Sequence, residues 1–231
     1  MRAGTLFFIA VAAIVFGACV GGPAPIVIHE ERDLSVWLKF DPTSGFGHDH
    51  PVQISTAHMA AVLGGLRVLP RSAIGGLKAS DERGDAVFVP SEVTRLAPLL
   101  SQALAKASSK DIATFYQRGG DRSTGPLITS GGMAWRNQAL YIMLANARTS
   151  PATRLYETSH EVDTRDDPLL PIARYNFSVR FEPQEAEKPK GQAGDRYVDP
   201  AKVVVVDLGK LPGSQGSARP GAAPSALSPS R

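Results

Sequence analysis

Hydrophobic and polar residues alternate along several short stretches of the chain, which is the pattern of strands with one buried face. The alternation is clearest in residues 34–40 and 172–181 and weaker in residues 155–162. Shorter apolar stretches, also predicted to be strands, lie at residues 26–28, 67–69, 86–89 and 202–208.

Two longer apolar runs lie in the middle of the chain, at residues 127–135 and 139–147. The three residues between them, Arg136-Asn137-Gln138, predict the turn of a β-hairpin. The second run is apolar on both faces and therefore predicts a central strand, although a buried helix fits the same pattern.

Three segments have the spacing of amphipathic helices. They are expected to begin at Ser55 or Thr56, at Ser91 and at Ser109, since serine and threonine cap helices well. Pro98 must kink the second helix or start a new segment. Helices grouped early and strands grouped late predict an α+β fold, in which about three helices pack on one face of an antiparallel sheet.

The first residues of the chain have the pattern of a secretory signal peptide. Arg2 supplies a charged start, an apolar run extends from Leu6 to Phe16, and small residues follow. The run is shorter than the roughly 20 residues that a membrane-spanning helix needs. Ordinary cleavage before Cys19 would put Phe16 at a position that prefers a small residue.

The segment Phe16-Gly17-Ala18-Cys19 resembles the lipobox of bacterial lipoproteins, with Phe16 where leucine is usual. The resemblance implies cleavage after Ala18, acylation of Cys19 and a lipid tether to a membrane. Val20 follows the cysteine instead of aspartate, which in Gram-negative lipoproteins favours the outer membrane, facing the periplasm. Cys19 is the only cysteine, and a lone cysteine in an exported chain indicates an intermolecular bridge or a modified thiol.

The expected organisation is therefore a signal peptide (residues 1–18), a tether (19–25), one α+β domain (26–208) and a tail (209–231). The tail is rich in Gly, Pro, Ser and Ala, and such a composition predicts disorder. Apolar residues make up 43% of the chain, which suffices for a packed core.

Charge excludes one class of partner. The isoelectric point is near 9.1 and the net charge is +3. Arg2 of the leader and three basic residues of the tail supply four positive charges, so residues 19–208 carry a net charge of −1. The domain lacks the basic character of a nucleic-acid-binding protein.

The segment His48-Asp49-His50 is the sharpest candidate for chemistry. Side chains two residues apart on an extended chain point the same way, so both imidazoles could meet one zinc or copper ion. His58 or His29 would supply a third ligand. The alternative is a solvated loop rich in glycine and histidine.

Other candidates are weaker. A general base with an orienting carboxylate could come from His29-Glu30-Glu31 or from His160-Glu161 with Asp163. Ser130-Gly131-Gly132 lacks the Gly-x-Ser-x-Gly frame of a nucleophile elbow, and its glycines predict a bulge or a close approach of two backbones. Arg174 and Arg180 could form an anion site, but a plain solvated sheet face is the favoured interpretation.

The leading hypothesis is a membrane-tethered envelope protein without enzymatic activity, which binds an envelope protein or has a structural role. A periplasmic metal-binding protein using His48 and His50 is the alternative, and a hydrolase is a third possibility. The body between residues 48 and 147 also resembles domains of uncharacterised bacterial lipoproteins, but no motif carries a functional residue over.

Overall fold

The computed structural model describes residues 23–42, 47–70, 84–120, 123–151, 165–172, 177–190 and 199–212. The predicted signal peptide, Cys19, the possible strand at residues 155–162 and the tail beyond Pro212 lie outside these ranges. So do His160, Glu161, Asp163 and Arg174.

The main feature is a seven-stranded antiparallel sheet with the order β1-β2-β5-β6-β7-β10-β9. Its strands are β1 (Ile26–Glu30), β2 (Leu34–Phe40), β5 (Asp111–Gly119), β6 (Leu127–Arg136), β7 (Ala139–Thr149), β10 (Val203–Val206) and β9 (Glu187–Lys188). A small antiparallel sheet has the order β4-β3-β8, formed by β4 (Asp85–Ala86), β3 (Leu66–Pro70) and β8 (Phe177–Phe181). The expected α+β class and the large antiparallel sheet are confirmed.

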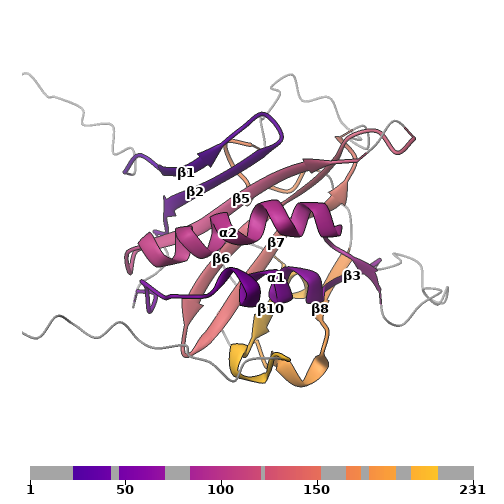
Figure 1. Cartoon of the computed structure of the whole chain (residues 1–231). Coiled ribbons are helices and arrows are strands. Elements are labelled where there is room, and N and C mark those ends of the chain that lie inside the picture. Colours follow the sequence, from indigo (N-terminus) through magenta and orange to yellow (C-terminus); the bar gives the residue numbers. More distant parts are fainter. Residues whose placement is uncertain are drawn as a thin grey trace, which may run out of the picture.

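Both α-helices of the described residues, α1 (Thr56–Gly65) and α2 (Pro90–Lys106), lie over the same face of the large sheet (Figure 1). Ser55 caps α1 as predicted, since its Oγ accepts a hydrogen bond from the backbone N–H of His58 at 3.1 Å. The cap of α2 is Val89 instead of Ser91, and Pro90 occupies the first helical position, where it needs no hydrogen-bond donor. Pro98 lies inside a helix that continues through it.

The prediction of a third helix is wrong. The segment that begins at Asp111 is strand β5, which pairs with β2 on one side and β6 on the other. All residues from Ile112 to Gln117 are buried, so both faces of the strand are covered. Ile112, Phe115 and Tyr116 have helical spacing, but such spacing also arises in a strand that is apolar on both faces.

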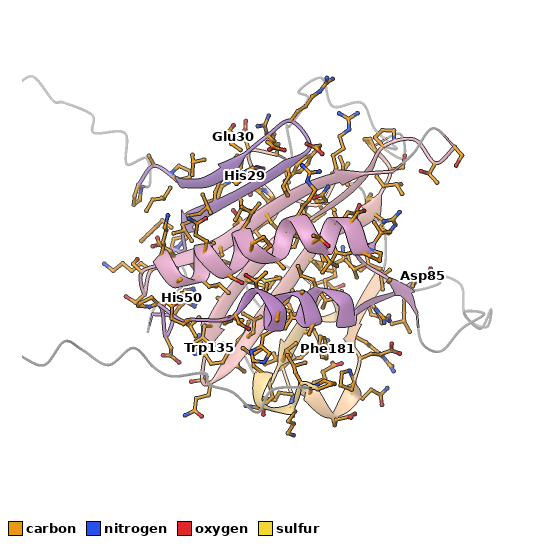
Figure 2. All side chains as sticks on the ribbon, in the orientation of Figure 1. His29, Glu30, His50, Asp85, Trp135 and Phe181 are labelled. Carbon is orange, nitrogen blue, oxygen red and sulfur yellow. The ribbon has the colours of Figure 1, made fainter. Side chains whose placement is uncertain are left out.

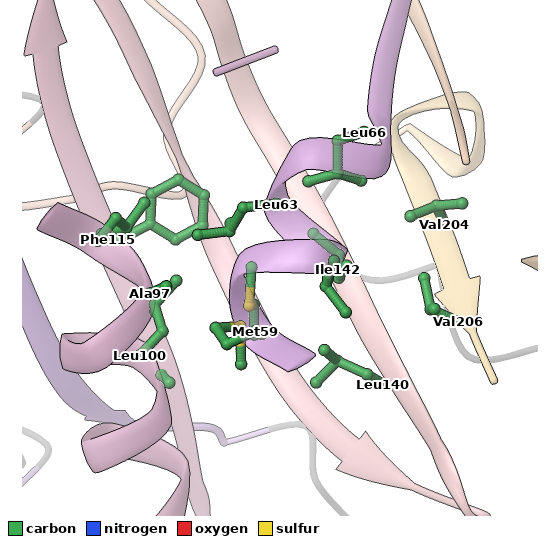
Figure 3. Packing of buried hydrophobic residues seen from close by; sticks show 14 of the residues in the cluster. Met59, Leu63, Leu66, Ala97, Leu100, Phe115, Leu140, Ile142, Val204 and Val206 are labelled. Carbon is green, nitrogen blue, oxygen red and sulfur yellow. The ribbon is translucent and has the colours of Figure 1, made fainter. Parts of the chain in front are cut away.

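The core lies between the two helices and the sheet. Figure 3 shows side chains of both helices meeting those of β5, β7 and β10. Its fully buried members include Met59, Leu63, Leu100, Phe115, Ile142 and Val204.

The opposite face of the sheet is covered by residues 165–172, here called the crossing segment. Leu169 packs against a second buried cluster formed by Ile112, Ala134, Met143 and Val203, which come from four strands of the sheet. At one end of the segment, the Lys39 ammonium on β2 donates a hydrogen bond to the backbone oxygen of Asp166. The large sheet is therefore a middle layer, with α1 and α2 on one face and the crossing segment on the other.

Strands β6 and β7 form the predicted hairpin. Asn137 and Gln138 at its tip have φ values of 50° and 55°, as in the two-residue turns that match the twist of a hairpin. The register is irregular at Ser130 and Gly131. A Cβ atom on Gly131 would collide with the backbone oxygen of Met143, which confirms the predicted close approach.

Candidate functional site

The loop that carries His48 and His50 is fixed by its backbone to two strands. The His48 N–H donates to the oxygen of Ser109, just before β5, at 2.7 Å, and the Asp49 N–H donates to the oxygen of Trp135 on β6 at 2.9 Å. The Asp49 carboxylate also accepts the N–H of Asn137 in the hairpin turn at 2.7 Å. The two histidines are therefore held at one end of the sheet.

His48 is paired with a carboxylate. Its Nε2 lies 2.9 Å from Oδ2 of Asp41, and the two side chains are 9% and 4% exposed. A carboxylate beside Nε2 places the ring proton there, so that Nδ1 carries a free lone pair. Nδ1 of His48 is buried and has no hydrogen-bond partner among the described residues.

His50 lies beside His48 and is partly buried. Burial, and secondarily the positive charge that His48 can carry, lower the pKa of His50 from 6.5 to about 4. The ring is therefore neutral near pH 7. Its Nε2 faces the backbone N–H of Trp135 at 3.4 Å, and its Nδ1 is buried without a partner in the described part of the chain.

The two-residue spacing brings the imidazoles together as expected. The ring centroids are 5.5 Å apart and the ring planes are inclined by 62°. Asp41 was not predicted as a partner of His48, from which it lies seven residues away in the chain.

Neither predicted third ligand joins the two histidines. His29 lies on β1, well apart from His50 (Figure 2), and its Nε2 is 3.4 Å from a carboxylate oxygen of Glu31. His58 lies in the first turn of α1. Within the described ranges, no group of three or more His, Cys, Asp or Glu side chains could hold a metal ion.

The acidic residues around His29 take part in ion pairs that join layers of the fold. Arg95 of α2 contacts Asp33 at 2.7 Å and Glu31 at 2.8 Å, and its hydrogen bond lowers the pKa of Asp33. Glu30 pairs with Arg165 of the crossing segment at 3.0 Å. These contacts explain the acidic cluster as a link between the β1–β2 hairpin, α2 and the crossing segment.

Ser130 accepts a hydrogen bond from a residue that the sequence did not single out. Nδ2 of Asn146 on β7 donates to Oγ of Ser130 at 2.8 Å and to the backbone oxygen of Leu170 at 2.9 Å. Oδ1 of Asn146 accepts the N–H of Ile172 at 2.8 Å. Asn146 thus fastens the crossing segment to the sheet, and Ser130 supports it.

An open depression of about 360 Å³ lies where β5 ends. It is lined by Arg32, Asp33, Arg118, Gly119 and Gly120 and contains no histidine. The hydrolase hypothesis calls for a pocket with a histidine beside a nucleophile, and this depression does not supply one. Arg180 is exposed on β8, as a solvated sheet face predicts.

Among the described residues, no helix has the length and apolar character needed to cross a membrane. Compared with models of protein families, with curated protein sequences and with solved structures, the chain gives no significant match.

Proposed function

We propose that the chain is a bacterial lipoprotein, anchored through an acylated Cys19 to the outer membrane and facing the periplasm, with a binding or structural role and no enzymatic activity. The observation that carries the proposal is Phe16-Gly17-Ala18-Cys19 at the end of a short apolar leader. The position of the body supports it, because the first strand begins at Ile26, only seven residues after Cys19. The tether is therefore short.

The strength of the anchor depends on how much hydrocarbon the acyl chains bury in the membrane. Each methylene of an acyl chain adds about 0.8 kcal/mol to membrane binding, and one chain alone binds reversibly. Lipoprotein cysteines resemble the stable case, because that family carries several chains on the modified residue. The leader, the acylated tether and the body then have separate tasks: export, anchoring and contact with a partner, respectively.

The anchor is tested by Cys19→Ser in cells supplied with labelled palmitate. We expect the wild-type chain to incorporate the label and to sediment with membranes, and the variant to do neither. Phe16→Leu is the matched control, since it restores the usual lipobox residue and should leave labelling intact. A Cys19→Ser chain that still takes up label and still sediments with membranes contradicts the proposal.

The partner is tested separately by crosslinking in cells. A binding role predicts that the anchored chain captures the same envelope protein in repeated experiments. Cys19→Ser should reduce that capture, because the chain no longer stays at the membrane. Failure to capture any partner reproducibly would favour a purely structural role.

A second candidate function, metal binding at His48 and His50, is favoured by the Asp41–His48 pair. Histidine ligands of metals commonly donate their other ring N–H to a carboxylate, which fixes the ring and raises its basicity. Asp41 stands in this position at 2.9 Å, and Nδ1 of His48 is left free. Two imidazoles fall short of the four ligands of a structural zinc site, so they fit a weakly held zinc or copper ion with solvent ligands.

Metal analysis of the purified chain tests this candidate. We expect bound zinc or copper in the wild type and its loss in His48→Ala plus His50→Ala. His58→Ala is the control, because it removes a histidine outside the pair. A metal content near zero that the double substitution does not change removes the candidate.

A further inference from the structure

Three exposed apolar side chains gather at the free end of the β1–β2 hairpin. Ile26, Val27 and Phe40 are 54%, 55% and 38% exposed, and they are here called the apolar end. Ile26 is paired with Leu38, and Phe40 follows two residues later on the same face of β2. Ile26 and Phe40 are therefore diagonal neighbours, whereas Val27, which is paired with Trp37, points to the other face.

A second strand fits this edge poorly. β1 is the outermost strand of the large sheet, and such an edge offers backbone groups to another chain. The register of β1 against β2 shifts between Val27 and His29, which is a bulge, and Pro25 immediately precedes the strand. Bulges and prolines commonly prevent an edge strand from pairing with a strand of another chain. The apolar end is thus better suited to an occupant that needs side chains alone.

The position of Cys19 indicates that occupant. Six residues separate Cys19 from Ile26, and the seven Cα–Cα steps between these two residues span at most about 25 Å even when fully extended. Pro23 and Pro25 restrict the backbone of this stretch. An acyl group on Cys19 would therefore keep Ile26 and Val27 within a short reach of the membrane surface.

Lys110 lies beside the apolar end, and Lys106 lies four residues before it in the chain. Phe40 is paired with Asp111, and the next residue, Asp41, donates its N–H to the oxygen of Lys110 at 2.8 Å. Lys106 and Lys110 are both exposed, at the end of α2 and just before β5. The Asp111 carboxylate is engaged by the N–H of Ser108 at 2.8 Å. Cations beside exposed apolar side chains suit the headgroup region of an anionic bilayer.

We propose that the apolar end docks on the surface of the same membrane that holds the acyl group, with Ile26, Val27 and Phe40 in the headgroup–acyl boundary and Lys106 and Lys110 on anionic phospholipids. The inference rests on the proposed lipid anchor. It adds a defined orientation of the domain to that anchor: this end of the sheet faces the bilayer, and the β1–β2 turn points away from it.

The test uses the full acylated chain in vesicles of phosphatidylethanolamine and phosphatidylglycerol. Lys106 and Lys110 are modified with a membrane-impermeant amine reagent, and the rates are read by peptide mass spectrometry. We expect both lysines to react at least threefold more slowly in the wild type than in Val27→Ser plus Phe40→Ser. Val89→Ser is the matched control, since Val89 is also 38% exposed but begins α2 at its other end, and it should keep the wild-type rates.

Each outcome is distinct. Equal rates in the wild type and the double variant, with both chains floating with the vesicles, contradict the docking and leave the anchor standing. Slow reaction that persists in detergent, together with a dimeric mass, assigns the apolar end to a second copy of the chain and also contradicts the docking. A wild-type chain that carries no acyl group and does not float contradicts the anchor, and the docking with it. Unfolding curves confirm that the substitutions leave the fold intact.

Discussion

Two adjacent glycines at the end of α1 have opposite surroundings. A Cβ atom on Gly65 would collide with the backbone oxygen of Glu182 and lie 2.6 Å from the Phe181 ring, whereas a Cβ atom on Gly64 would meet nothing within 4 Å. The end of α1 therefore packs on β8 so closely that only glycine fits at residue 65.

We expect Gly65→Ala to lower the free energy of unfolding by about 2–3 kcal/mol, because β8 must shift to accommodate the methyl group. Gly64→Ala should be neutral or should raise stability by up to about 1 kcal/mol, since alanine favours the helix over glycine. Denaturant unfolding of both variants measures the difference. Equal effects of the two substitutions would contradict the close packing of α1 on β8.

The environment of His50 strongly alters its protonation. Its pKa of about 4 in the folded chain lies below the ordinary value of 6.5. Between these two pH values, the imidazole of His50 is protonated in the unfolded chain and neutral in the folded chain. The free energy of unfolding therefore decreases as the pH falls from about 6.5 to 4. Above pH 6.5 both states are neutral at this site, and the effect vanishes.

We expect the free energy of unfolding, measured with a chelator present, to fall by on the order of 1–3 kcal/mol through this window because of His50. His50→Gln should remove most of that slope, while His58→Gln controls for the loss of a histidine elsewhere. If the slope of His50→Gln matches that of the wild type, the imidazole is protonated as easily in the folded chain as in the unfolded one.

At the residue scale, the sequence predicted what depends on local spacing. The two-residue interval between His48 and His50 was enough to place the rings side by side. Asp41 and Asn146 were not predicted as site residues, for different reasons. Asp41 lies seven residues before His48, and nothing local marks the two as a pair. Asn146 is a polar residue in a mainly apolar strand, and its partners Leu170 and Ile172 are more than 20 residues away.

At the scale of elements, prediction succeeded where a turn or a helix cap marks an element and failed at β5, where apolar residues recur at helical spacing. The hairpin β6–β7 and helix α1 were predicted close to their observed bounds. Strand β5 was mistaken for a helix, because burial on both faces removes the alternation that marks a strand. Only pairing with β2 and β6 decides its conformation, and pairing partners cannot be read from a local window.

The crossing segment is an element without regular secondary structure, and its attachment depends on Asn146. We expect Asn146→Ala to lower the free energy of unfolding by about 1–3 kcal/mol, because it leaves the Ile172 N–H and the Leu170 oxygen without their partner. Amide hydrogen exchange in residues 165–172 should accelerate.

Ser130→Ala is the control for that experiment. It removes only the acceptor at 2.8 Å and keeps the contacts between Asn146 and the crossing segment. Its effect on stability should be smaller, and exchange in residues 165–172 should stay slow. If exchange in residues 165–172 stays slow in Asn146→Ala as well, the segment is held by Leu169 and its neighbours instead of by Asn146.

At the scale of the molecule, the class of the fold followed from the order of elements, but its layering did not. Helices on one face of an antiparallel sheet were expected, and two helices take that place. The cover of the opposite face depends on contacts of the crossing segment with β5, β6, β7 and β10, which are distant in sequence. The separate sheet of β3, β4 and β8 arises from equally distant pairs.

The orientation proposed for the whole molecule depends on the length of the tether. Ten Gly and Ser residues inserted after Val20 would extend the stretch between Cys19 and Ile26 from six to sixteen residues, and the effective concentration of the apolar end at the bilayer would fall about fourfold. We therefore expect Lys106 and Lys110 to react faster with the impermeant reagent, while acylation and flotation stay unchanged. The same insertion after Pro212 lies outside the tether and should leave both rates as they are. If the long tether leaves both lysines as slow as in the wild type, proximity to Cys19 does not determine the docking, and the apolar end must bind the bilayer by its own affinity.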